Sequence, residues 1–148
     1  MSEQTTSSIV MEATPAEVMA AIADFESYPL WAKGVSKTEI VEPGADGLAR
    51  VVRFNLDVPP VRDEYELAYT WQSPHRVSWT LVRANLLKAL DGSYEIVDLG
   101  NGTCQVTYTL TLDLLIPFIG MLKRKGEKLI IDAALSGLRA RVESIAGR

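Results

Sequence analysis

A long amphipathic segment follows a strand-rich stretch in this chain, and the two together constrain the fold more than any other feature. From Pro117 to about Ala146, apolar residues recur with the period of an α-helix. At 1.5 Å per residue, a helix of about 30 residues is about 45 Å long, enough to cross a small domain. Such a helix must bury its apolar side against another layer. The sequence therefore predicts an α+β domain in which one long helix packs on an antiparallel sheet.

The apolar and charged residues of this segment fall on opposite sides of the expected helix. The apolar side holds Ile119, Leu122, Gly126, Leu129, Ile130, Ala133, Gly137 and Ala140, and the charged side holds Lys125, Lys128, Asp132, Arg139 and Glu143. Small residues at 126, 133 and 137 either let the helix approach the sheet closely or leave volume for a ligand. In both cases this side is expected to face the sheet.

Between residues 35 and 114 the hydrophobic pattern alternates with a period of two, which is typical of strands with one buried face. Turn residues at 43–47, 73–75, 91–92 and 100–102 divide this stretch, and with a short strand at Ile9 and Met11 they predict about seven strands in a meander. The residues expected on the buried parity are Leu48, Val52, Phe54, Leu56, Tyr65, Leu67, Tyr69, Trp71, Val77, Trp79, Leu81, Tyr94, Ile96, Val106, Tyr108, Leu110 and Leu112.

Two short helices are expected between the first and second strands. Thr14 can cap a helix, Pro15 suits its first position, and Glu17 completes a capping box, which predicts a helix over about 15–24. The aromatic turn 25–31 leads into a second short helix that ends at Gly34. Residues 1–6 are polar and expected to be flexible, which leaves 7–147 as one domain.

The charge of the chain is unevenly distributed. Residues 1–114 carry 8 Lys and Arg against 16 Asp and Glu, a net charge of -8, whereas residues 115–148 carry 7 against 3, a net charge of +4. An acidic body argues against general nucleic-acid binding, which needs clustered positive charge. The basic C-terminal part is compatible with contact with an anionic surface, and this remains an alternative interpretation.

Other sequence features bear on the compartment. Cys104 is the sole cysteine, so one chain forms no internal disulfide and no thiolate metal cage, as is typical of a reducing cytoplasm. The first residues lack the pattern of a signal peptide. The longest apolar stretch, 110–122, is interrupted by Asp113 and Pro117 and is too short to span a bilayer. We therefore expect a soluble cytoplasmic protein.

Several local motifs, taken in their order along the chain, resemble a known superfamily over roughly residues 7–146. They are Pro15 and Val18, the turn Tyr28-Pro29-Leu30-Trp31, Gly92-Ser93-Tyr94 with Ile96, Gly102-Thr103 leading to Val106-Thr107-Tyr108, and the closing helix. The chain resembles the polyketide cyclase/dehydrase and START-like (SRPBCC, helix-grip) superfamily, which includes coenzyme Q-binding members. The resemblance implies a curved six- to seven-stranded antiparallel sheet wrapped around the long C-terminal helix, with an apolar cavity between them.

The inward residues are the candidate ligand site. The residues expected to bind ligand are Trp31, Arg50, Phe54, Tyr65, Leu67, Tyr69, Trp79, Leu81, Arg83, Tyr94, Tyr108, Leu122, Leu129, Ile130 and Ala133. The aromatic residues either line a cavity or fill the core, and as a group they favour a cavity, because inward tyrosine hydroxyls need partners. Where the superfamily places its second helix, Trp31 is either a gate to the pocket or an anchor for that helix. Arg50 and Arg83 either meet a ligand carboxylate or enolate, or reach solvent from strand ends.

The remaining polar candidates favour structural interpretations. Asp91 is expected in a turn beside Gly92 rather than acting as a base. His75, the sole histidine, is interpreted as a turn residue, and its being the only one excludes a multi-histidine metal site. We expect Cys104 to be packed. No catalytic residue, cofactor or metal is predicted.

Three functional hypotheses follow. The leading one is the binding or carriage of a hydrophobic small molecule such as a polyketide, quinone, isoprenoid or lipid. The second is a polyketide aromatase/cyclase or dehydratase, in which an arginine stabilises an enolate and a tyrosine moves the proton. The third is an interaction module at a membrane or ribosome. A membrane contact would use Phe118, Met121, Lys123, Arg124 and Lys125; the protein is expected to be a monomer or homodimer.

Overall fold

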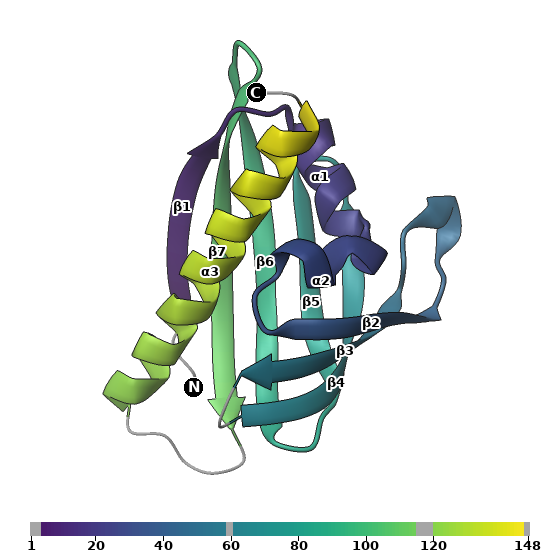
Figure 1. The fold of residues 1–148 in the computed structure, drawn as a ribbon, viewed down its shortest axis with the longest axis vertical. Helices are drawn as coiled ribbons and strands as arrows, with labels where there is room; N and C mark the ends of the chain where they lie inside the picture. Colours follow the sequence, from purple (N-terminus) through teal and green to yellow (C-terminus); the bar gives the residue numbers. More distant parts are fainter. Residues whose placement is uncertain (1–3, 59–60, 115–119, 147–148) are drawn as a thin grey trace.

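The computed structural model describes residues 4–58, 61–114 and 120–146, which form an antiparallel sheet crossed by one long helix (Figure 1). The elements are, in order, β1 (Thr5–Met11), α1 (Pro15–Ala23), η1 (Phe25–Ser27), α2 (Tyr28–Trp31), β2 (Val35–Glu42), η2 (Ala45–Gly47), β3 (Val51–Val58), β4 (Val61–Gln72), β5 (Arg76–Arg83), β6 (Leu87–Gly100), β7 (Thr103–Leu114) and α3 (Gly120–Ala146). The predicted helix-grip architecture is confirmed.

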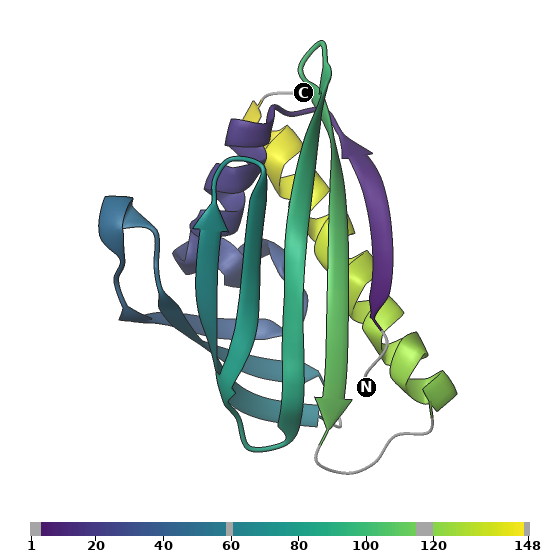
Figure 2. The same cartoon turned by 180° about the vertical axis from the view of Figure 1, so that it is seen from behind.

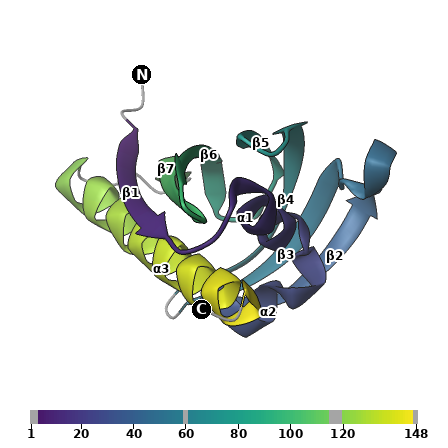
Figure 3. The ribbon, with the colours of Figure 1, turned by 90° about the horizontal axis from the view of Figure 1, so that it is seen from above.

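The described strands make one seven-stranded sheet in the order β1-β7-β6-β5-β4-β3-β2. Every neighbouring pair is antiparallel. Strands β2 to β7 form a meander, and β1 pairs with β7 at one edge of the sheet. Seen from above, the sheet is strongly curved and the helices lie in its concave side (Figure 3). Seen from behind, the convex face carries no helix (Figure 2). In β5 and β7 buried residues alternate with more exposed ones, as predicted, whereas β2 contains no buried residue.

The predicted start of α1 is confirmed in atomic detail. The Thr14 side chain accepts a hydrogen bond from the Glu17 backbone N–H at 3.2 Å, and the Glu17 carboxylate accepts one from the Thr14 N–H at 2.8 Å. This reciprocal capping box satisfies two N–H groups that the helix itself cannot. Val18 and Ile22 are then fully buried under α3 and the sheet. Tyr28, at the start of α2, donates to the Ile22 carbonyl at 2.6 Å and ties α2 to α1.

Two distinct sides of α3 face the interior. One side is packed in the core and consists of Ile131, Leu135, Leu138 and Val142, all at most 2% exposed. The side predicted to be buried lies about 160° around the helix from it, at about 100° per residue. That predicted side includes Leu129, which is 65% exposed, and Ile130, which is 37% exposed. The prediction of the packed face was therefore wrong.

A buried glutamate explains why the packed side was hard to predict. Glu127 lies on that side and is fully buried, so a charged residue interrupts the apolar pattern. Its Oε2 accepts a hydrogen bond from the Leu112 backbone N–H at 2.6 Å, and its Oε1 accepts one from the Thr5 hydroxyl at 2.6 Å. Pairing between β1 and β7 ends at Thr5 and Leu110. Glu127 thus supplies the acceptor that Leu112 lacks beyond the end of β1.

The first strand begins earlier than predicted. β1 begins at Thr5 rather than near Ile9, so Thr5 and Thr6, expected to be flexible, belong to the sheet. On the outer face, hydroxyls pair across the β1–β7 ladder, and the Thr6 and Thr109 hydroxyls lie 3.1 Å apart. A polar sequence is compatible with this strand because its alternate side chains are solvated.

The turn expected at Asp91 and Gly92 does not form, because β6 runs without a break from Leu87 to Gly100. A Cβ at Gly92 would lie 2.8 Å from a ring carbon of Trp79 and 2.6 Å from the Thr109 carbonyl oxygen. The glycine is required by this close approach, not by a turn. The Asp91 carboxylate accepts a hydrogen bond from the Leu81 N–H at 2.8 Å, beyond the end of the β5–β6 ladder.

A buried aspartate holds the connection from β5 to β6. The carboxylate of Asp63 accepts hydrogen bonds from the backbone N–H groups of four residues, Glu64, Asn85, Leu86 and Leu87, at 2.8 to 3.2 Å. Burial acts to raise the pKa of Asp63, but these four donors outweigh it and lower the pKa below its ordinary value. The ionised form is therefore the one that the fold stabilises.

Substitution of two glycines in α3 is expected to have opposite effects on stability. A Cβ at Gly137 would overlap the backbone carbonyl of Trp31, whereas at Gly126 the nearest atom is a Leu112 methyl carbon at 3.6 Å. Gly137→Ala should therefore lower the free energy of unfolding by about 1–3 kcal/mol through overpacking. Gly126→Ala should raise it by about 0.5–1 kcal/mol through helix propensity. Urea unfolding measures both, and changes of the same sign would contradict the packing described here.

Asp63→Asn is expected to destabilise the protein in a pH-dependent way. Because the folded pKa is depressed, ionised Asp63 stabilises the fold above the ordinary carboxyl pKa of about 3.9, and this contribution is lost as pH falls through the lower folded value. At pH 7 we expect a loss of about 1–3 kcal/mol, the usual cost of removing a buried acceptor. Urea unfolding at a series of pH values should show the difference from wild type shrinking in acid.

The matched control is Asp98→Asn. Asp98 also accepts a backbone hydrogen bond, from Gly100 at 2.9 Å, but it is exposed near the end of β6. This change should alter stability by less than about 0.5 kcal/mol. A pH-independent effect of Asp63→Asn would show that the charge of Asp63 is not what the fold stabilises.

Candidate functional site

A cavity of about 340 Å³ lies between the concave face of the sheet and α3. The α2–β2 region and the sheet contribute Tyr28, Trp31, Ala32, Lys33, Val35, Phe54, Leu56, Tyr65, Leu67, Tyr69, Trp79, Leu87, Leu90, Tyr94, Tyr108, Leu112 and Leu114. From α3 come Gly126, Leu129, Ile130, Ala133 and Ala134. A lining that is mostly aliphatic and aromatic, with a few hydroxyls, is typical of sites for small organic molecules, and so is this volume.

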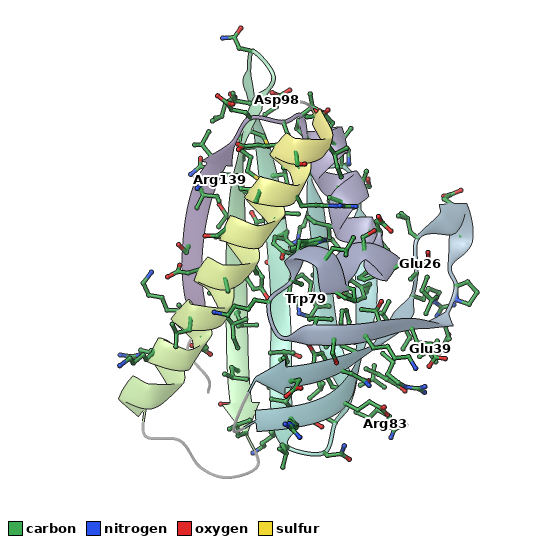
Figure 4. The ribbon with its side chains drawn as sticks, viewed as in Figure 1. Glu26, Glu39, Trp79, Arg83, Asp98 and Arg139 are labelled. Carbon is green, nitrogen blue, oxygen red and sulfur yellow. The ribbon has the colours of Figure 1, made fainter. Side chains whose placement is uncertain are left out.

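Aromatic rings contact one another along the cavity wall. The ring centroids of Tyr94 and Tyr108 are 4.7 Å apart at a steep angle, and Trp79 lies 5.4 and 5.5 Å from these two rings. Phe54 stacks on Tyr65 at 5.3 Å. Figure 4 shows Trp79 in the interior, between the sheet and the helices. These contacts hold the rings in place, so the wall is formed before any ligand arrives.

Four tyrosine hydroxyls in this wall lack a hydrogen-bond partner among the residues that the structure describes. They belong to Tyr65, Tyr69, Tyr94 and Tyr108, whereas Tyr28 donates to the Ile22 carbonyl. These hydroxyls border the cavity, so a ligand atom that enters it can complete a hydrogen bond with them. The site can therefore orient oxygen atoms on an otherwise apolar ligand.

These tyrosines are held in the neutral form. Burial raises the pKa of Tyr28, Tyr69, Tyr94 and Tyr108 well above the ordinary value, and neighbouring tyrosines raise it further. Burial and the charge of Asp63 likewise raise the pKa of Tyr65. A neutral tyrosine donates or accepts a hydrogen bond, but a raised pKa opposes its acting as a base near neutral pH.

Most of the predicted ligand-binding residues line the cavity. Those that do are Trp31, Phe54, Tyr65, Leu67, Tyr69, Trp79, Tyr94, Tyr108, Leu129, Ile130 and Ala133. Leu81 does not line it; this half-buried residue pairs with Leu67 across the β4–β5 ladder and packs against the core. The side chain of Leu122 lies outside the described residues. That a ligand contacts these residues remains a prediction.

The two arginines expected to face a ligand lie elsewhere. Arg50 is exposed just before β3 begins. The side chain of Arg83 is 62% exposed, with Nη1 3.6 Å from Oε2 of Glu66, and it points away from the sheet in Figure 4. A register shift between Glu66 and Leu67 interrupts the β4–β5 ladder, so the inward parity of β5 does not continue to Arg83. Of the two alternatives considered for these arginines, the structure therefore agrees with exposure to solvent at a strand end.

Trp31 has the anchoring role considered for it, whereas its role as a gate remains a prediction. It lines the cavity, and its ring centroid lies 4.7 Å from that of Tyr28. Its backbone carbonyl lies so close to Gly137 that no side chain fits there, which anchors α2 on α3. Its indole N–H is buried without an acceptor among the described residues.

The predicted ligand-binding set omitted several residues that line the cavity. Tyr28 and the aliphatic residues Leu87, Leu90, Leu112 and Leu114 line the cavity, and so does Lys33. Spacing from Trp31 could have indicated Tyr28, because residues three apart share a helix face. Nothing in the local pattern indicated Lys33, which lies between α2 and β2. It is the only charged residue in the described lining.

The other polar candidates lie outside the cavity. His75 lies in the β4–β5 turn, as predicted, with Nδ1 3.4 Å from the Ile96 carbonyl oxygen. Cys104 is fully buried, and burial, with Asp98 and Glu17, raises the pKa of its thiol to about 11. Within the described part of the chain, no three His, Cys, Asp or Glu side chains are grouped as a metal site requires.

The residues proposed for membrane contact are described only in part. Phe118 and the side chains of Met121 and Lys123 lie outside the described residues. Arg124 and Lys125 are exposed on α3. Among the described helices, none has the length and apolarity needed to cross a membrane.

Solved structures show the same fold at low sequence identity. A START superfamily protein from Mycobacterium smegmatis superposes with a TM-score of 0.89 at 18% identity, covering 96% of this chain and 98% of its own. The Zhui aromatase/cyclase from Streptomyces sp. R1128 gives 0.76 at 15%, covering 97% and 94%. A protein from Thermus thermophilus, TTHA0849, gives 0.79 at 20%, covering 97% and 99%. At these identities the likeness shows the fold alone.

The family is shown by sequence. No curated protein matches the chain. The family model described as polyketide cyclase / dehydrase and lipid transport matches residues 2–143, which agrees with the resemblance found in the motifs. Because that match spans nearly the whole sequence, the chain belongs to the polyketide cyclase/dehydrase and lipid transport family.

Proposed function

We propose that this protein binds or carries a hydrophobic small molecule of the polyketide, quinone, isoprenoid or lipid kind in the cavity under α3. The observation that carries the proposal is the unpaired set of tyrosine hydroxyls at 65, 69, 94 and 108 in an otherwise apolar wall. Apolar surface supplies affinity, and a few fixed hydroxyls orient the ligand. The fold and family of ligand-binding proteins to which the chain belongs support the same conclusion.

Binding is favoured over catalysis by the chemistry of the wall. The described lining has no Asp, Glu, His or Cys side chain, and its one cation is Lys33. General acid–base catalysis works best with a group whose pKa lies near the working pH. The tyrosines are shifted away from that range by burial.

The first experiment compares a cavity-filling variant with a matched surface variant. Ala133 lines the cavity, whereas Ala140 is exposed on the same helix and does not line it. Binding of the neutral fluorophore N-phenyl-1-naphthylamine should weaken by about ten-fold or more in Ala133→Phe, since an added ring occupies ligand volume. Ala140→Phe should bind like wild type.

Solvent extraction of the purified protein, followed by mass spectrometry against a mock purification, would identify a co-purified ligand. An apolar compound retained by wild type and Ala140→Phe but lost from Ala133→Phe would support the proposal. Failure of the folded protein to bind this fluorophore or any compound in a broad lipid and polyketide screen would refute it.

A second candidate function is a polyketide aromatase/cyclase or dehydratase. The family description and the likeness to the Zhui aromatase/cyclase favour it. In this chain, the hydroxyls of Tyr94 and Tyr108 would have to polarise a ketone by hydrogen bonding, because the arginines expected to help are exposed on the outside. Tyr108→Phe should then abolish turnover of a poly-β-ketone thioester while leaving N-phenyl-1-naphthylamine binding intact. Absence of product with wild type would rule this candidate out for that substrate.

A contact of the cavity mouth with a membrane is a third candidate. Leu129 and Ile130 line the cavity yet are 65% and 37% exposed, and Arg124 and Lys125 are exposed nearby on α3. Apolar residues beside cations suit an anionic bilayer surface. Co-sedimentation with phosphatidylglycerol vesicles, but not with phosphatidylcholine vesicles, and its loss in Leu129→Gln would support this contact. The cytoplasmic location and the oligomeric state stay predictions.

A further inference from the structure

Lys33 is the one charged residue in the described lining of the cavity. It lies in the short link between α2, which ends at Trp31, and β2, which begins at Val35, and both of these neighbours also line the cavity. Its side chain is exposed, so it stands where the cavity meets solvent. The rest of the described lining is apolar or carries neutral hydroxyl and indole groups.

The amine of Lys33 has no acidic partner among the described residues. Some cations of the chain are paired within the described residues: Lys128 lies 3.3 Å from Asp132, and Arg53 contacts Glu66 at 2.9 Å. Others, such as Lys37, have no ion pair there but lie away from the cavity, so Lys33 differs from them by its position in the lining. Lys33 forms neither an ion pair nor a side-chain hydrogen bond within the described chain. A cation at the mouth of an apolar cavity, with no acid of its own, favours a ligand that brings the negative charge.

The interior of the cavity sets where a charge on the ligand can go. Burying an anion without a cation or several donors is strongly unfavourable. The deep wall around Trp79, Tyr94 and Tyr108 offers neutral hydroxyls and rings, and no cation among the described residues. An anionic group on an apolar ligand is therefore tolerated only at the mouth, beside Lys33, with the apolar body directed inward.

We propose that the cavity takes an amphipathic organic anion, with its apolar body among the tyrosines and its acidic group paired with Lys33. This inference rests on the proposed binding function and specifies the ligand class and orientation. In this proposal Lys33 takes the role that the sequence analysis considered for Arg50 and Arg83, namely pairing with a ligand carboxylate. The basic face at the start of α3, where Arg124 and Lys125 are exposed, adds a positive potential that attracts such an anion.

Two fluorophores with the same apolar body test this inference. 8-Anilinonaphthalene-1-sulfonate carries one anionic group on the framework of neutral N-phenyl-1-naphthylamine. Wild type should bind the sulfonate more tightly. Lys33→Met, which keeps the apolar stem, should weaken sulfonate binding by about five-fold, the upper end for an exposed ion pair, and leave the neutral probe unchanged. Added salt should reduce the wild-type preference and not that of the variant.

The matched control is Lys37→Met, because Lys37 is an exposed lysine on β2 that does not line the cavity. It should leave the affinity for both probes unchanged, and Ala133→Phe should weaken both. If the neutral probe binds in the cavity but Lys33→Met leaves sulfonate binding unchanged or weakens both probes equally, the inference is overturned and the proposed function stands. If neither probe binds, both are overturned.

Discussion

The seating of α3 on the β1–β7 edge of the sheet is the constraint on which the rest of the structure depends. Ile131, Leu135 and Leu138 are almost fully buried there, and Glu127 takes the backbone N–H that β7 exposes where β1 ends. A buried backbone N–H without an acceptor and a buried carboxylate without a donor would each destabilise the fold. Here the N–H donates to the carboxylate, so both groups are paired. The polar contact therefore fixes the position along the strand at which the apolar side of the helix packs.

The cavity follows from how the helix is held at both sides. One side of α3 packs on β1 and β7, and at Gly137 the helix meets the Trp31 carbonyl of α2. Between these two contacts the curved sheet lies farther from the helix axis (Figure 3). The side of α3 that faces this space carries Gly126, Ala133 and Ala134, which are too short to fill it. Small residues on one helix thus serve both close approach and open volume.

The sequence predicts the fold well because alternation and capping are local. The parity of Tyr65, Trp79 and Tyr108 follows from strand geometry and needs no knowledge of neighbours. The errors arise where one long-range contact overrides a local pattern. Glu127 interrupts the apolar pattern of the packed side of α3. The register shift beside Glu66 leaves Arg83 exposed. The ring of Trp79 lies so close to residue 92 that a glycine is needed there within a strand. Lys33 could not be found because no periodicity governs a short link.

The cavity is kept open by small residues on α3. Its space of about 340 Å³ reaches solvent beside Lys33 and Leu129, both of which are exposed. Larger side chains at positions 126 and 133 would reduce this volume, and Gly126 has no close contact that requires a glycine. Packing alone therefore does not account for the glycine at 126, whereas the proposed apolar ligand would.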